Sequence, residues 1–143
     1  MPYKYLEDIG TADIAFEATG RDLPELFTAA ADATMNVMID NLDAIESREA
    51  QQIELSNDNI EMLLFDFLQE LIYFKDAERL LLRVRHVRID EKEEKYFLKA
   101  KGVGELLDET RHLQRADVKA VTLHYFSVEK EDGGWKARVL LDI

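Results

Sequence analysis

The sequence contains no cysteine, which excludes several kinds of chemistry at once. Without a thiol, the chain can form neither a disulfide framework nor a thiolate metal site, and it offers no cysteine nucleophile. Long apolar runs are absent too, because no stretch approaches the ~20 residues that a membrane-spanning helix needs. The opening M-P-Y-K-Y-L-E-D does not have the pattern of a signal peptide, so we expect a cytoplasmic protein.

Positive charge is also scarce. The 143 residues include 18 Lys and Arg against 30 Asp and Glu, a formal net charge of −12. Such a chain repels the phosphate backbone of nucleic acids, and no basic stripe with interleaved aromatic residues is visible. Direct, tight binding of RNA or DNA is therefore not expected. Cations, basic protein surfaces and small neutral ligands remain candidate partners.

The remaining composition is typical of one globular domain. Hydrophobic residues make up 47% of the chain and charged residues 34%, and a chain of this length can bury a substantial core. The few glycines and prolines fall at the boundaries of predicted elements, and we find no repeat, linker or low-complexity segment. We therefore predict a single domain over residues 1–143.

Two segments have the periodicity of amphipathic helices. The first begins after Asp22, which can cap it with Glu25 as in a capping box, and ends near Asp40. The second begins after Asn57 or Asp58, and its apolar residues cover much of its circumference. We interpret the second helix as a central core helix, with a partner-binding face as the alternative.

Strand-like patterns surround these helices. Short strands are predicted over residues 14–18 and 52–55, and four consecutive strands follow Arg79. A slip in apolar phase at residues 85–86 predicts a bulge, and E-D-G-G before Trp135 predicts a hairpin. Together these patterns predict an α+β fold: a mostly antiparallel sheet with two amphipathic helices on one face, in a single pair of layers.

Two aspartates fall at the ends of predicted strands. Asp142 has the opposite parity to the apolar residues of the last strand, and Asp13 has the opposite parity to Ile14 and Phe16. If the first and last of these strands are neighbours, both carboxylates converge with the terminal carboxylate of Ile143. Oxygen donors without His or Cys suit Ca²⁺, Mg²⁺ or Mn²⁺. The alternative is two solvated strand ends, and no EF-hand loop is present to decide between them.

Other chemical motifs are incomplete. G-V-G-E at residues 102–105 lacks the third glycine of a dinucleotide-binding loop, and we interpret it as a turn. The histidines His86, His112 and His124 have no zinc-site spacing, and His124 fits an ordinary strand position. The residues alone thus indicate an acidic α+β domain with a candidate cation site.

Several motifs resemble the archease family in order along almost the whole chain. They are Y-x-Y-L-E-D-I-G-T-A-D-I, D-L-P-E-L-F-x-A-A-A-x-A, M-I-D-N-L, L-L-F-D-F-L-Q-E-L-I-Y, G-E-L-L-D-x-x-x-H, V-K-A-V-T-L-H and V-L-L-D-I. Two positions depart from the family pattern: Gly10 replaces a histidine and Leu123 replaces a tyrosine.

The resemblance implies an accessory protein rather than an enzyme. Archease assists the RNA-splicing ligase of the RtcB type in tRNA splicing, promoting ligase guanylylation and multiple turnover. Carried over to this sequence, the resemblance implies a divalent-cation site, for calcium, at Asp13, Asp142 and Ile143. It also implies that Lys119 contacts the ligase or its nucleotide, with Asp40 as a weaker candidate near the same acidic tip.

Two other functions remain as alternatives. A chaperone-like protein-binding module would use the apolar face of the second helix. A metal-dependent hydrolase would use Asp13 and Asp142 around a metal-bound water, although no general base or nucleophile motif supports it.

Overall fold

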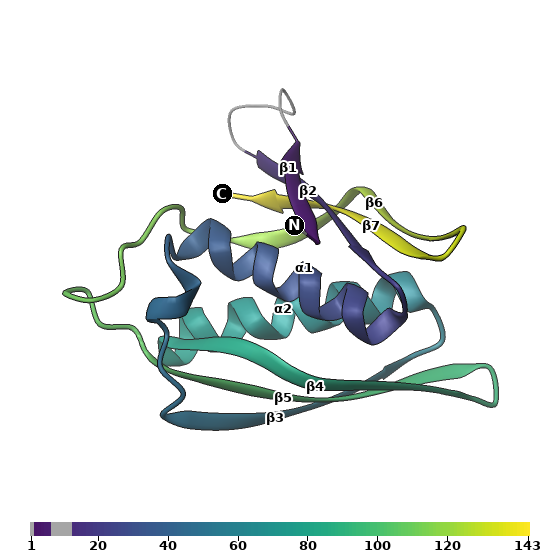
Figure 1. Cartoon of the computed structure of the whole chain (residues 1–143), viewed down its shortest axis with the longest axis horizontal. Coiled ribbons are helices and arrows are strands. Elements are labelled where there is room, and N and C mark those ends of the chain that lie inside the picture. The colour runs from purple at the N-terminus through teal and green to yellow at the C-terminus, as the bar shows by residue number, and fades with distance from the viewer. Residues whose placement is uncertain (1, 7–12) are drawn as a thin grey trace.

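The computed structural model describes residues 2–6 and 13–143. In this part of the chain, seven strands form two antiparallel sheets, and two long helices lie between them (Figure 1). The strand order is β1-β2-β7-β6 in one sheet and β3-β5-β4 in the other. The elements are β1 (Tyr3–Leu6), β2 (Asp13–Gly20), α1 (Leu23–Met38), the short 3₁₀ helix η1 (Leu42–Ala44), β3 (Glu49–Asn57), α2 (Ile60–Glu78), β4 (Leu80–Lys92), β5 (Lys95–Leu106), β6 (Ala120–Glu131) and β7 (Gly134–Asp142). Neither α1 nor α2 is long and apolar enough to cross a membrane.

The α+β class, the antiparallel strands and the two helices are confirmed, whereas the strands divide into two sheets instead of one. The helices can separate two sheets because each is apolar on more than one side. In α1 the small side chains of Ala29, Ala31 and Ala33 are buried in addition to the larger side chains of Leu26 and Phe27. A helix with two apolar sides packs a sheet on each.

Side-chain caps define where both helices begin. Asp22 caps α1 as predicted, and its carboxylate accepts a hydrogen bond from the backbone N–H of Glu25 at 2.9 Å. The cap of α2 is Asn59, and the prediction of Asn57 or Asp58 was wrong by one or two residues. The Asn59 side chain accepts hydrogen bonds from two backbone N–H groups of the first turn, at 2.8 and 3.1 Å. Both caps satisfy N–H groups that have no partner within the helix.

Helix α2 is a core helix, as we interpreted it. Its side chains also reach the edge strand β6, where Gln69 accepts a hydrogen bond from the Val121 N–H at 2.7 Å and Glu61 accepts one from the Val128 N–H at 3.0 Å. Unpaired N–H groups at a sheet edge invite pairing with other chains, so these contacts protect the edge.

The predicted bulge and hairpin are confirmed. The pairing of β4 with β5 shifts between Arg85 and Arg88, with His86 at a φ of 53°. The β6–β7 hairpin turns through Gly133, whose φ of 80° is readily accessible to glycine.

The segment G-V-G-E lies inside β5, and the predicted turn was wrong. A Cβ on Gly104 would collide with the backbone oxygen of Leu81, and one on Gly102 would lie 3.1 Å from the Leu82 side chain. Glycine therefore permits close approach of β4 to β5 here. The short strand β1, which the sequence pattern did not reveal, pairs along β2.

Candidate functional site

Asp13 and Asp142 lie directly opposite each other at one end of the four-stranded sheet. Asp13 is the first residue of β2, Asp142 is the last residue of β7, and the two strands are antiparallel neighbours. Residues in direct register project from the same side of a sheet, with Cβ atoms about 4.5–5.5 Å apart. The condition that these two strands be neighbours is therefore met, and the two aspartates share one face.

The pair lies at the margin of the core. Ile14 and Leu141 form the next pair along the strands, and Leu141 is buried. Both aspartates are only partly exposed. Like charges directly opposite each other destabilise a sheet, so the arrangement favours any ligand that brings positive charge between the carboxylates.

Two further predicted residues lie beside this pair. The backbone N–H of Lys119 donates a hydrogen bond to the Asp142 carbonyl oxygen at 2.8 Å, and Ala120 is opposite Asp142 in the register of β6 with β7. The Lys119 side chain is exposed. Ile143 directly follows Asp142 and is partly buried against the core. The structure thus brings Asp13, Asp142, Ile143 and Lys119 together at one end of the four-stranded sheet. We call these four residues the acidic edge.

Asp40 follows the end of α1 and is exposed. Its carboxylate forms an ion pair with Arg115 at 3.9 Å, and its backbone N–H donates to the carbonyl oxygen of Leu113. Both partners belong to the segment that leads to Lys119. The other position of interest, Gly10, lies outside the described residues.

A metal ion would need oxygen donors beyond this aspartate pair. Within residues 2–6 and 13–143, no group of three or more His, Cys, Asp or Glu side chains is placed to hold a metal ion. Two side-chain carboxylates are available at this end of the sheet, and a cation there would need a main-chain carboxylate, water or a group of a partner as additional ligands. Hard oxygen donors of this kind fit Ca²⁺, which accepts water and backbone oxygens.

Strand β6 contains a second bulge, which lies near the candidate site and was not predicted from the sequence. The pairing with β7 shifts between Thr122 and Ser127, and Tyr125 has a φ of 58°. Leu123 and Tyr125 are 59% and 63% exposed, and the His124 ring lies 4.2 Å from the Tyr125 ring. A signal was available in the sequence, because Val121 and Val128 have opposite parity, and a regular strand with a single buried face cannot bury both.

A buried ionic cluster, also missed, surrounds Glu105. The Glu105 side chain is 4% exposed and accepts hydrogen bonds from the Arg111 guanidinium, from the Glu46 backbone N–H at 2.7 Å and from His112 Nε2 at 3.0 Å. The Arg111 hydrogen bond is the largest of the effects that lower the pKa of Glu105 to about 2. His112 Nδ1 accepts from the Asp108 backbone N–H at 2.9 Å, which leaves Nε2 as the donor toward Glu105.

This cluster joins the loop after β5 to the segment before β3. Its residues come from the G-E-L-L-D-x-x-x-H stretch, so the spacing of Glu105, Asp108 and His112 was the available signal. Every polar atom of these buried side chains has a partner, since no buried side-chain nitrogen or oxygen among the described residues lacks a hydrogen bond. The cluster is a structural clamp and offers no unpaired group for catalysis.

The fold and this edge define a class: a small α+β protein in which two antiparallel sheets enclose two helices, with paired acidic residues at the end of one sheet. The family model of the archease protein family matches residues 3–143. The chain belongs to the archease family.

Individual relatives agree with this assignment. The chain is 40% identical over 134 residues to the protein archease of Pyrococcus abyssi, covering 93% of this chain and 94% of that protein. It is 41% identical over 133 residues to the protein archease of Methanothermobacter thermautotrophicus, with the same coverage.

Two solved structures share the fold. The solution structure of protein 1598 of Methanobacterium thermoautotrophicum superposes with a TM-score of 0.86 at 37% identity, over 99% of each chain. A crystal structure of "an archease, possible chaperone" from Thermotoga maritima superposes with a TM-score of 0.61 at 18% identity, over 94% of this chain and 93% of that one. At that identity the second comparison bears on the fold alone.

Proposed function

We propose that this protein is a non-catalytic accessory factor that activates an RNA-splicing ligase of the RtcB type in tRNA splicing. It promotes guanylylation of the ligase and allows multiple turnover. Membership of the archease family supports the activity, and the direct opposition of Asp13 and Asp142 is the observation that carries its assignment to one edge.

In this proposal the edge holds a divalent cation, calcium. The carboxylates of Asp13 and Asp142 and the carboxyl group of Ile143 are the ligands. The opposed carboxylates support it because two like charges in direct register need a counter-charge, and oxygen-only donors select a hard cation. The cation supplies positive charge at an otherwise negative edge.

The ligase docks over the same edge. Lys119 is exposed and fixed next to Asp142 by its backbone hydrogen bond, so its ammonium group can contact an acidic group or a phosphate of the ligase complex. Farther along the chain, the β6 bulge exposes the side chains of Leu123 and Tyr125. An exposed apolar contact next to charged groups is typical of a protein-binding surface.

The chaperone-like alternative loses most of its proposed surface. Of the apolar residues of α2, Ile72 is buried and Phe65 packs edge-on against Phe126 with ring centroids 5.9 Å apart. Tyr73 is the exposed one, at 55%. A broad apolar groove for unfolded clients is therefore not supported along this helix.

The test is guanylylation of a cognate ligase by labelled GTP, with wild type, Asp13→Ala, Asp142→Ala and the control Asp132→Ala. Asp132 is an exposed carboxylate in the β6–β7 turn, away from the edge. We expect both edge variants to lose stimulation while they remain folded by circular dichroism, and the control to stimulate normally. Normal stimulation by both folded edge variants would refute the assignment of the site.

The same proteins separate the alternatives. A chaperone-like module would suppress client aggregation regardless of calcium and of Asp13→Ala. A metal-dependent hydrolase would turn over substrate in the absence of any ligase, and would lose that turnover in Asp142→Ala.

A further inference from the structure

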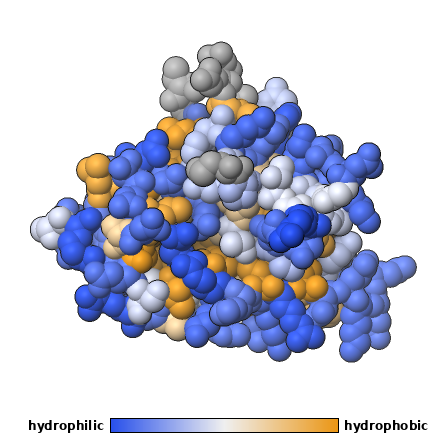
Figure 2. All heavy atoms as spheres, in the orientation of Figure 1, coloured by the Kyte–Doolittle hydropathy of each residue, from blue (hydrophilic) through white to orange (hydrophobic). Residues whose placement is uncertain are grey.

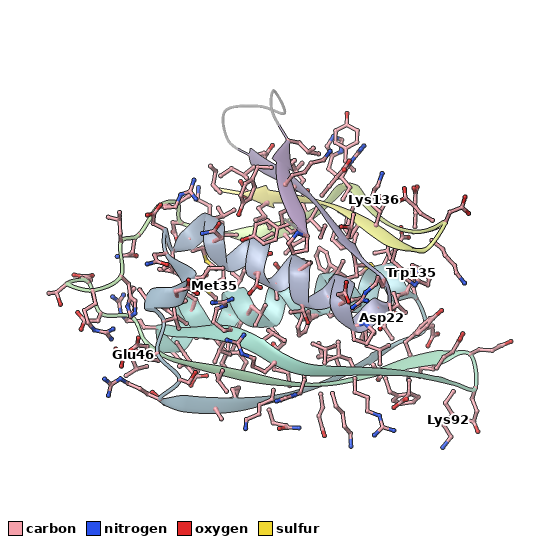
Figure 3. All side chains as sticks on the ribbon, viewed as in Figure 1. Asp22, Met35, Glu46, Lys92, Trp135 and Lys136 are labelled. Atoms are coloured by element: carbon pink, nitrogen blue, oxygen red, sulfur yellow. The ribbon has the colours of Figure 1, made fainter. Side chains whose placement is uncertain are left out.

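One sheet face carries a concentration of positive charge in a protein of net charge −12. The outer face of the β3-β5-β4 sheet lies away from the two helices, and Figure 3 shows nitrogen-tipped side chains projecting from it, with Lys92 labelled at the hairpin end. Within β5 the alternation is regular: Phe97, Lys99 and Lys101 are exposed, and Leu98 and Ala100 between them are buried. The strand therefore gathers one aromatic and two cationic residues on the solvent side.

The β4 bulge adds two arginines to the same face. Arg85 and Arg88 are three residues apart, so in a regular strand they would project from opposite faces. The bulge at His86 shifts the register, and Arg85 lies opposite Lys101 while Arg88 lies opposite Lys99. Bulges re-aim side chains in this way and are frequent beside functional sites.

The result is two successive pairs of like charges across neighbouring strands. Like charges directly opposite each other destabilise a sheet, so the fold gains nothing from this arrangement. The Arg88–Lys99 pair is partly neutralised, because Arg88 forms an ion pair with Asp90 at 2.9 Å and Lys99 forms one with Glu54 at 3.8 Å. Among the described residues, neither Arg85 nor Lys101 forms an ion pair. An anionic ligand would relieve the repulsion.

Phe97 identifies the kind of anion. Its side chain is 42% exposed, and it borders an open hollow of about 250 Å³ between β3 and β5. The other residues that line this hollow are Glu54, Leu55, Ser56, Leu98 and Lys99. Aromatic side chains on which bases stack, flanked by cations that hold the backbone, are the features by which sheets bind single-stranded nucleic acid. An acidic protein surface would be attracted by the cations but would have no particular need of an exposed aromatic ring.

We infer that the outer face of the β3-β5-β4 sheet binds a short single-stranded RNA segment. A base stacks on Phe97, and Arg85, Arg88, Lys99 and Lys101 contact phosphates. The inference does not depend on the proposed function. The face of the molecule in Figure 2 is largely hydrophilic. Because the net charge of the protein is negative, we expect the RNA binding to be weak, and because it depends on phosphate contacts it should fall strongly with salt. This refines the sequence-based expectation, which was that direct, tight binding of nucleic acid is disfavoured.

The test is fluorescence anisotropy of a short labelled oligouridylate titrated with the whole protein at low ionic strength and along a salt series. Four phosphate contacts predict that the logarithm of the association constant falls with the logarithm of salt with a slope of about −3. Phe97→Ala is expected to weaken binding roughly 5- to 100-fold, and Phe97→Tyr to keep it, since stacking is retained.

Charge reversal supplies the matched comparison. Arg85→Glu with Lys101→Glu is expected to weaken binding strongly and, in the residual binding at the lowest salt concentrations, to reduce the magnitude of the salt slope by about 1.4. Lys4→Glu with Arg21→Glu makes the same change in net charge at exposed side chains of other elements and is expected to leave binding within about twofold. Circular dichroism confirms that each variant is folded.

Three results would overturn the inference. The first is absence of binding by folded wild type at low salt, and the second is an equal loss of binding in both charge-reversal variants. The third is binding of polyglutamate as strong as that of the RNA, together with an unaffected Phe97→Ala variant. That result would identify the face as a site for acidic proteins.

Discussion

The buried Glu105 cluster offers the sharpest test of how this fold is held together. Glu105→Gln keeps the shape of the side chain and removes its negative charge. The amide can still hydrogen-bond, but two arginines lose their buried counter-charge. They are Arg111, which is hydrogen-bonded to the carboxylate, and Arg48, whose Nε lies 3.5 Å from it. Hydrogen bonds to charged groups and buried ion pairs are costly to break, so the variant should be clearly destabilised.

The lowered pKa of Glu105 gives the size of the expected loss in the free energy of unfolding. The folded protein lowers it from 4.5 to about 2, chiefly through the Arg111 hydrogen bond. At about 1.36 kcal/mol per pKa unit, the ionised carboxylate stabilises the fold by at most about 3 kcal/mol. Because the folded-state pKa is the lower one, this stabilisation is complete above the unfolded-state pKa and is lost as the pH falls toward 2. About 2 kcal/mol of it should already be gone near pH 3.

Urea unfolding of wild type and Glu105→Gln at about pH 7, 5 and 3 measures this difference. The free-energy gap between the two proteins should be close to its maximum at neutral pH and shrink to about a third of that near pH 3. Glu109→Gln is the control, because its ion pair with Arg79 is largely exposed and should contribute less than about 1 kcal/mol. A gap below about 0.5 kcal/mol, or one that does not change with pH, would refute the buried-clamp interpretation.

The remaining predictions concern the helix cap and the β5 glycines. Asn59→Ala should lower the free energy of unfolding by about 1 kcal/mol, because two N–H groups of α2 lose their acceptor. Asp58→Ala should change it by less. Urea unfolding of both variants tests which of the two residues caps the helix. Gly104→Ala should be destabilised by more than about 2 kcal/mol, since the new methyl group meets the Leu81 backbone. In Gly102→Ala the new methyl group meets the Leu82 side chain, which can move, so this variant should lose less stability than Gly104→Ala. Equal melting temperatures for the two glycine variants would contradict this expectation.

Periodicity was sufficient to predict much of this fold. The Asp22 cap, the bulge at Arg85 and the hairpin at Gly133 follow from local patterns that act over a few residues. The opposition of Asp13 and Asp142 was also accessible, because parity and position at the strand ends required only that the two strands be neighbours.

The missed features depend on contacts between segments far apart in the chain. The division into two sheets follows from which strands pair, and β5 contains glycines that read as a turn until the closeness of β4 is known. The Glu105 cluster joins residues up to 65 positions apart through side chains that look like ordinary surface charges. The cations on the outer face of the β3-β5-β4 sheet could not be predicted for the same reason. Net charge averages over all faces, and only the register of β4 on β5 brings these cations together.

Calcium titration by isothermal calorimetry is the most direct test of the acidic edge. We predict that wild-type protein binds calcium, that Asp13→Asn and Asp142→Asn each weaken this binding at least about tenfold, and that Asp132→Asn does not. Asparagine keeps the size of each side chain and removes one negative charge. Absence of calcium binding by the wild type, or equal binding by wild type and both edge variants, would contradict the assignment of a cation site to Asp13 and Asp142.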